Sequence, residues 1–326
     1  MPTLIRWLAA ALAALSCAAA AAQATTDGWP NRTIRWIVTF PPGGSADSLV
    51  RAMAPLLSER LGQQVIVENR PGAGGNIGLD VVAKSPPDGY TIGLGAAGAL
   101  SVNVSLYQKM PFDPVKDFEP ITLIASIPFV LVAHPGLAAQ NPRELVALAK
   151  AQPGTLTIGH GGNGTAMHLS AELLKQTAGI QLVPVAYKGS GPAAQDATGG
   201  QVHLAIVDLP SSLGLIRGGR LKAIGVTPNR RVAALPDVPT LAEAGVAGFE
   251  SIGWFGAVAP AGTPGPIVQR LNAEMVKILN EPSIRERFVA AGTEPMPTTP
   301  QEFAQLIRQE IPKWAKVIRD ANIKLE

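Results

Sequence analysis

With 326 residues the chain exceeds what one hydrophobic core usually serves, so its length predicts two lobes. Its 27 lysines and arginines nearly balance 24 aspartates and glutamates, no basic run occurs and aromatic residues make up 5%, so we expect no nucleic-acid partner. Cys17 is the only cysteine, which excludes a disulfide framework, a cysteine-ligated zinc site and a cysteine nucleophile.

The first 24 residues have the form of a cleaved signal peptide. Arg6 precedes an apolar run that is too short to span a bilayer, and the small-residue triplet Ala22-Gln23-Ala24 follows it. A lipoprotein signal that uses Cys17 is the alternative, but Ala14-Leu15-Ser16 is a poor approach to an acylated cysteine. No later apolar stretch is long enough to cross a membrane, so the mature protein is expected to be soluble and periplasmic.

Short β-branched runs then alternate with helical patterns, which is typical of βαβ units and parallel sheets. The first strand ends at Pro41-Pro42-Gly43-Gly44, and Gly62 closes the helix behind it. Strands are predicted at residues 33–40, 64–68 and 90–94, with helices from Ser45 and through residues 81–83.

Residues 129–133 are predicted to cross into a second lobe, and residues 254–259 to return from it. Between them, Asn141, Pro142 and Glu144 are cap residues that begin a helix. Further elements are a helix at residues 165–179 and strands at 155–158, 183–187, 204–207 and 221–226.

The C-terminal third is predicted to be helical. A capping box at Thr299 and Glu302 begins the last helix, which Pro312 is expected to bend. The predicted fold class is α/β, with one lobe of residues 25–128 plus 255–326 and a second of residues 129–254. Each lobe is expected to be a mostly parallel sheet flanked by helices, and two crossing strands join them.

A glycine-rich loop follows a strand and precedes a helix in both halves. Pro42-Gly43-Gly44-Ser45-Ala46-Asp47 is the first, and Gly161-Gly162-Asn163-Gly164-Thr165 is the second. Such turns leave backbone N–H groups unpaired at the positive end of a helix dipole, which favours anions. Tight turns without a ligand are the alternative. Asp47 is better explained as a helix-start charge, while Ser45 and Thr165 fit helix caps, ligand donors or both.

The sequence lacks the motifs of an enzyme. Residues 93–98 and 159–164 match the dinucleotide-binding glycine pattern, but the strand after the second match ends at Tyr187-Lys188-Gly189-Ser190 without the acid that would hold a ribose. No hydrolase or Walker motif occurs, and the four histidines lack metal-binding spacing. We therefore expect no cofactor, no metal and no catalytic residue. His160 is a possible loop donor to a ligand, and His168 fits a packed histidine.

An ordered set of segments through the mature chain resembles the Bug-type substrate-binding proteins of tripartite tricarboxylate transporters. The set consists of residues 40–45, 69–78, 87–91, 111–118, 162–165, 187–192, 235–240 and 254–256. The resemblance implies a two-lobed periplasmic-binding-protein fold, type II-like, in which the two loops hold carboxylates through backbone N–H groups and water. It implies first-lobe contacts at Pro42, Gly43, Gly44, Ser45, Ala46 and Asp47. It implies second-lobe contacts at Gly161, Gly162, Asn163, Gly164 and Thr165, with Gly98, Ala99 and Tyr187 at the border.

Three departures from the family pattern concern specificity. Ala46 stands where the family often has Thr, His160-Gly161 where it has Ser-Ser, and Val207-Asp208 where it has Asp-Asn. Val207 removes a carboxylate that would receive an ammonium, while Asp208 is left as a residue that can still face the cleft. These departures predict a dicarboxylate or an aromatic acid rather than an amino acid.

The predicted function is capture of a small carboxylate by closure of two lobes, followed by transient delivery to membrane transporter subunits. The protein is expected to act as a monomer. One alternative is a ligand sensor for a membrane signalling receptor. The other is an exported enzyme acting on a small acid, with His160, His168 or Asp208 as acid or base, which would need a nucleophile, metal or cofactor that the sequence does not reveal.

Overall fold

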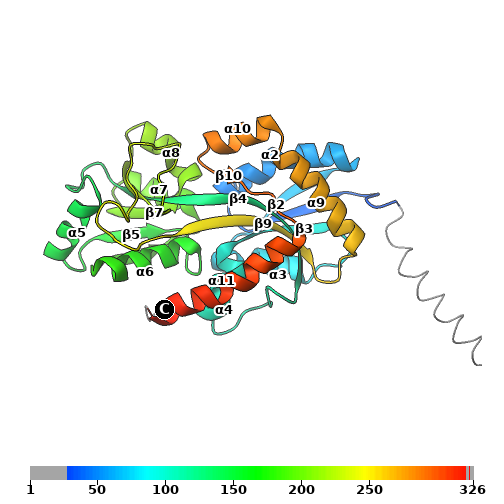
Figure 1. Cartoon of the computed structure of the whole chain (residues 1–326), viewed down its shortest axis with the longest axis horizontal. Coiled ribbons are helices and arrows are strands. Elements are labelled where there is room, and N and C mark those ends of the chain that lie inside the picture. Colours follow the sequence, from blue (N-terminus) through cyan, green and yellow to red (C-terminus); the bar gives the residue numbers. More distant parts are fainter. Residues whose placement is uncertain (1–27, 321–322, 324–326) are drawn as a thin grey trace, which may run out of the picture.

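The computed structural model describes residues 28–320 and residue 323. The predicted signal peptide, residues 1–24, lies outside the described residues. Strands and helices alternate along the chain and form an α/β molecule of two lobes (Figure 1). Of the helices in the described part, none is both long and apolar enough to cross a membrane.

The elements fall into three groups along the chain. The first group contains β1 (Ile34–Val38), α2 (Ser45–Leu61), β2 (Val65–Asn69), the 3-10 turn η1 (Ala73–Gly75), α3 (Asn76–Ala83), β3 (Thr91–Ala96), the π-helical turn η2 (Gly98–Val102) and α4 (Asn103–Leu106). The second contains β4 (Phe118–Ala133), α5 (Pro142–Ala151), β5 (Thr157–His160), α6 (Ala166–Ala178), β6 (Val183–Ala186), α7 (Ser190–Thr198), β7 (Leu204–Asp208), α8 (Leu209–Arg217) and β8 (Lys222–Val226). The third contains β9 (Ile252–Pro260), α9 (Gly265–Leu279), α10 (Pro282–Ala290), β10 (Glu294–Pro295) and α11 (Pro300–Asp320).

Each lobe has a parallel core of three strands. In the first lobe β1 lies between β2 and β3, and in the second β5 lies between β6 and β7. The connections between these strands carry helices, as the alternating pattern of the sequence predicts. The loops that precede α2 and α6 therefore lie at the carboxyl ends of parallel strands, where open α/β sheets bind ligands.

Two long strands join the lobes and make the sheets mixed. β4 pairs antiparallel with β9 from Phe118 to Pro128, and from Phe129 it pairs antiparallel with β7 and β8. Figure 1 shows β4 and β9 side by side through the middle of the molecule. The sequence predicted only residues 129–133 as the outgoing strand. The strand in fact begins earlier. Pro120 and Pro128 interrupt the strand pattern in the sequence, but the structure accommodates the first beside a register shift and the second where β4 passes to the other sheet.

The helix ends follow local sequence signals. The side chain of Asn141 accepts the Glu144 N–H at 3.0 Å, and Thr299 accepts the Glu302 N–H at 3.2 Å, as the capping patterns predict. Gly62 ends α2 in the left-handed conformation, at φ 69°. Helix α11 continues through Pro312.

The buried apolar residues form one large cluster through both lobes, a second cluster within the second lobe, and a third that includes residues of η2, α4, α6 and α11. The third cluster contains Leu169 of α6 together with Val102 of η2 and Trp314 of α11. Because the large cluster runs through both lobes, the lobes meet through buried apolar contacts in this structure.

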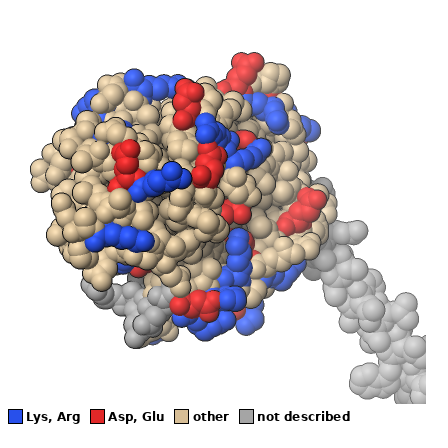
Figure 2. Space-filling model, turned by 60° about the vertical axis from the view of Figure 1, so that its left-hand side comes forward, with Lys and Arg blue, Asp and Glu red and all other residues tan. Residues whose placement is uncertain are grey.

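Figure 2 shows Lys and Arg interspersed with Asp and Glu over one face.

Candidate functional site

The first glycine-rich loop is held in place by the Asp47 carboxylate. Its Oδ2 accepts the Gly43 N–H at 2.9 Å, while Oδ1 accepts Arg51 Nε at 2.8 Å and Asn69 Nδ2 at 2.9 Å. Burial alone would raise the pKa of Asp47, but the hydrogen bonds from Arg51, Gly43 and Asn69 together hold it below its ordinary value. Asp47 thus stabilises the loop, in line with its interpretation as a helix-start charge.

The start of α2 is left open to a ligand. Gly44 is its N-cap and supplies no side-chain cap. Among the described residues no acceptor receives the N–H groups of Ser45 or Ala46. Unpaired amides at the positive end of a 17-residue helix attract anions.

The second glycine-rich loop is organised differently, because two histidines accept hydrogen bonds from two of its backbone amides. Nδ1 of His160 accepts the Gly162 N–H at 3.3 Å, and Nδ1 of His168 accepts the Gly164 N–H at 3.4 Å. Thr165 Oγ1 donates to the Gly162 carbonyl at 2.7 Å and accepts the His168 N–H at 3.2 Å, which caps α6. Three of the loop amides, those of Gly162, Gly164 and Thr165, are therefore paired within the protein.

The two imidazoles are stacked and neutral. Their ring centroids are 4.8 Å apart, with 28° between the planes. Burial, followed by the charge of the neighbouring His168, lowers the pKa of His160 to about 3, and burial also lowers the pKa of His168. At neutral pH both rings are therefore acceptors for loop amides.

Acidification is expected to destabilise the folded protein through His160. The unfolded chain protonates this histidine below its ordinary pKa of 6.5, whereas the folded protein does so only near 3. Between these values the unfolded state binds more protons, so the free energy of unfolding falls as the pH falls, by up to about 1.4 kcal/mol per pH unit for one such group. Urea unfolding across this pH range measures the slope.

The control for this prediction is His160→Asn. Asparagine Oδ1 can accept the Gly162 N–H but does not titrate. The variant is expected to lose part of the slope between pH 6.5 and 3 while His168 retains its share. An unchanged slope would show that His160 does not cause the acid sensitivity.

A buried hydrogen bond joins the two lobes at the site. Ser45 Oγ donates to Asp208 Oδ2 at 2.8 Å, although the residues are 163 positions apart. Asp208 Oδ1 accepts the Ser211 N–H at 2.9 Å and so caps α8, and the Asp208 N–H donates to Ser190 Oγ at 3.0 Å. Asp208 is 4% exposed and lines the cleft. Both of its carboxylate oxygens accept hydrogen bonds from the protein.

Other contacts show that the lobes are closed on each other. Tyr107 Oη donates to the Asn163 carbonyl at 3.2 Å. A Cβ added at Gly98 would lie 2.5 Å from the Gly164 carbonyl oxygen of the facing loop. The lobes thus approach so closely here that glycine is required.

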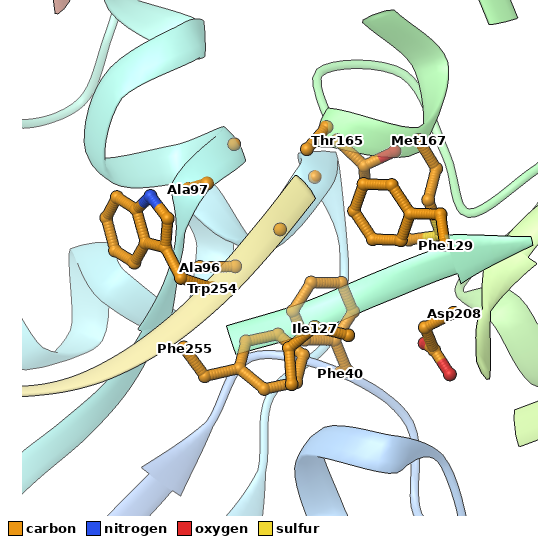
Figure 3. Close-up of a pocket in the computed structure, with 14 residues that line it drawn as sticks. Phe40, Ala96, Ala97, Ile127, Phe129, Thr165, Met167, Asp208, Trp254 and Phe255 are labelled. Carbon is orange, nitrogen blue, oxygen red and sulfur yellow. The ribbon is translucent and has the colours of Figure 1, made fainter. Parts of the chain in front are cut away.

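Three cavities lie along this closure. The first, with a volume of about 30 Å³, is mostly apolar (Figure 3) and is lined by Phe40, Gly74, Ala96, Ala97, Gly98, Ile127, Phe129, Thr165, Ala166, Met167, Asp208, Gly253, Trp254 and Phe255. The second, with a volume of about 250 Å³, is lined by Phe40, Pro41, Pro42, Gly43, Gly44, Ser45, Met167, Gly189, Ser190, Gly191, Pro192, Asp208, Ser211 and Phe255. The third, with a volume of about 250 Å³, is lined by residues 39–40, 71–75, 107, 161–163 and 186–188.

The structure distributes the predicted contacts unevenly over these cavities. The first two are lined by Pro42, Gly43, Gly44, Ser45, Gly98, Thr165 and Asp208, and the third by Gly161, Gly162, Asn163 and Tyr187. None of the three is lined by Ala46, Asp47, Ala99, His160 or Gly164.

Tyr187 is fixed by a neighbour on α7. Its hydroxyl donates to Asp196 at 2.9 Å, and burial, with Asp196 second, raises the pKa of Tyr187 to about 12.

Several residues that line the cavities were not among the contacts predicted from the sequence. Ser190, Gly191 and Ser211 lie at the starts of α7 and α8. The run Tyr187 to Gly191 repeats the strand, glycine and helix pattern of the first loop, so this pattern was a usable signal. Phe129 and Met167 carry no such signal, because only the sheet crossing and the α6 start bring them to the cleft.

A comparison with known families identifies the family of this chain. The family model described as "Tripartite tricarboxylate transporter family receptor" matches residues 49–323. The chain belongs to this family. Protein BugT of Bordetella pertussis, a relative, is 39% identical over 313 residues, 96% of either chain. The UPF0065 protein in the tcbD-tcbE intergenic region of a Pseudomonas species is 40% identical over 293 residues, 90% of this chain and 87% of that one.

Solved structures of similar proteins have the same fold. The structure described as R. palustris Rpa4515 with adipate has a TM-score of 0.88 and 38% identity, and it covers 91% of this chain and 99% of that one. The periplasmic binding protein BugD has a TM-score of 0.87 and 35% identity over 91% of this chain and all of that one. MatC from Rhodopseudomonas palustris, with bound malate, has a TM-score of 0.84 and 33% identity over 89% of this chain and all of that one. The two-lobed receptor fold expected from the sequence is confirmed.

Proposed function

We propose that this chain is a periplasmic solute-binding receptor that closes its two lobes over a small carboxylate and delivers it to a tripartite tricarboxylate-type transporter. The observation that carries the proposal is the open start of α2 in a cavity that the facing lobe completes. A carboxylate there contacts both lobes at once, so it stabilises the closed state by its greater affinity for that state. The adipate and malate of two similar structures are carboxylates, which supports this ligand class.

The state of Asp208 favours ligands without an ammonium group. An ammonium needs an acceptor, and both Asp208 oxygens already accept hydrogen bonds, one from Ser45 and one from Ser211. A ligand ammonium would have to share one of these oxygens with a donor that already uses it. We therefore favour a dicarboxylate or an aromatic acid over aspartate or glutamate.

Binding of such acids is expected to raise the melting temperature of the purified protein. A ligand that binds only the folded state stabilises it in proportion to the logarithm of its concentration over Kd, about 2.7 kcal/mol at a hundredfold excess over Kd. Thermal unfolding in the presence of mono- and dicarboxylates, aromatic acids and amino acids measures this effect. The expected result is a shift with at least one acid that lacks an amino group, and mass spectrometry showing that the acid is unchanged.

Two outcomes would contradict the proposal. Ligand-free protein that no acid stabilises would argue against a carboxylate receptor. Chemical conversion of the acid would favour an enzyme instead.

A further inference from the structure

The third apolar cluster joins the two lobes outside the ligand cavities. It contains Val102 of η2, Leu106 of α4, Leu169 of α6, and Trp314 and Ile318 of α11. None of these residues lines any of the three cavities along the closure. Within the described part of the chain, Leu169 is the one member of the cluster that comes from the second lobe, where α6 connects β5 to β6.

The Leu169 side chain is buried against the first lobe. It is 0% exposed, and the buried apolar residues with which it clusters belong to η2, α4 and the end of α11. Separation of the lobes would expose this side chain to water. Because exposure of apolar area costs free energy, the cluster stabilises the closed arrangement over an open one.

Helix α11 carries the contact from one lobe to the other. It packs along η2 and α4 of the first lobe, and Figure 1 shows it running to a place beneath α6. Trp314 is held in place by its Nε1, which donates to Glu310 Oε2 one turn earlier at 2.7 Å. Near the end of the helix, Gln176 Nε2 of α6 donates to the Asp320 carbonyl at 3.3 Å. The end of α11 therefore holds α6 through a buried apolar cluster and a hydrogen bond.

The start of α6 also carries the second glycine-rich loop. Thr165 is the N-cap of α6, and its carbonyl accepts the Leu169 N–H at 3.3 Å. On the facing lobe, Tyr107 directly follows α4 and donates to the Asn163 carbonyl of the same loop. One helical turn thus separates the buried leucine from the loop that closes over the cleft.

We infer that Leu169 and the end of α11 form a latch that stabilises the closed arrangement from outside the ligand cavities, an inference that rests on the proposed function. The latch changes the population of the closed state without contacting the ligand. Apparent affinity falls in proportion to the fraction of protein in the binding-competent state. Loss of the latch should therefore weaken every ligand by the same factor, whereas loss of a cavity residue weakens different ligands unequally.

The test is calorimetric titration of Leu169→Ala and Ile318→Ala with malate and with adipate. Each variant should raise the Kd of both acids by about tenfold, because a buried apolar side chain that bridges the lobes is truncated. Small-angle scattering should show a larger radius of gyration for both ligand-free variants than for the original protein. Ile318→Ala leaves the second lobe unaltered, so a loss in both variants cannot result from damage to that lobe.

Leu221→Ala is the matched control. Leu221 is 2% exposed and belongs to the cluster within the second lobe, and it lines none of the three cavities. This variant should melt at a lower temperature but bind both acids within about twofold of the original protein.

Three outcomes bear on the latch and on the proposed function separately. Latch variants that bind both acids as tightly as the control would overturn the latch and leave the proposed function intact. Losses that differ more than about threefold between malate and adipate would also overturn it, because a latch outside the cavities cannot distinguish ligands. If the original protein bound neither acid, that result would count against the proposed function, and equal radii of gyration for the latch variants and the control would overturn the latch.

Discussion

Gly98→Ala is expected to raise the Kd for ligand by about 5- to 150-fold without unfolding either lobe. The added Cβ would lie 2.5 Å from the Gly164 carbonyl oxygen and 3.1 Å from Thr165 Cα, both backbone atoms of the facing lobe. Overpacking of this kind costs about 1–3 kcal/mol, which corresponds to that range of affinity. The cost falls on the closed state, because the clash exists only when the lobes meet.

Calorimetry and small-angle scattering check this result. The variant should bind weakly. At a ligand concentration that compacts the original protein, the radius of gyration of the variant should stay larger than that of the original protein. Gly214→Ala is the matched control, since Gly214 lies in helix α8 and a Cβ there would meet nothing within 4 Å. If Gly98→Ala bound as tightly as the control, closure at this contact would not be needed for capture.

Asp47→Ala is expected to lower the free energy of unfolding by about 3 kcal/mol. The substitution removes three hydrogen bonds to a carboxylate that is 3% exposed, which leaves the Gly43 N–H without its acceptor and Asn69 Nδ2 with the Phe40 carbonyl alone. Hydrogen bonds to charged groups contribute about 1.5–3 kcal/mol each, and solvent partly replaces the partner of the half-exposed Arg51. Urea unfolding at neutral pH measures the loss.

Asp80→Ala is the control for this prediction. Asp80 also pairs with a basic residue four positions later, Lys84 at 2.8 Å, but the lysine is 70% exposed. Exposed pairs of this type contribute about 0.3–0.5 kcal/mol. Similar losses in the two variants would mean that the loop anchor at Asp47 adds nothing beyond a surface ion pair. Ligand affinity should fall only in Asp47→Ala, because the anchored loop lines the cavity.

Local hydrogen bonds made much of the fold predictable. Asp47 bonds to Gly43 and Thr165 to His168 over three or four positions, so sequence spacing alone indicates them. The alternation of strands and helices likewise predicted both parallel cores and the loops at their carboxyl ends. The start of β4 was missed, since Pro120 lowers strand propensity locally while pairing with β9 stabilises the strand.

The sequence by itself determined the helix starts, the parallel units and the family, because these depend on residues a few positions apart or on ordered motifs. Only the tertiary structure decided which loop amides have partners within the protein. It paired the Gly162 and Gly164 amides of the second loop with the buried rings of His160 and His168, and it joined Ser45 to Asp208 across 163 positions. Such pairs form when the crossing strands bring two lobes together, and their burial, rather than any local pattern, sets which donors remain for a ligand.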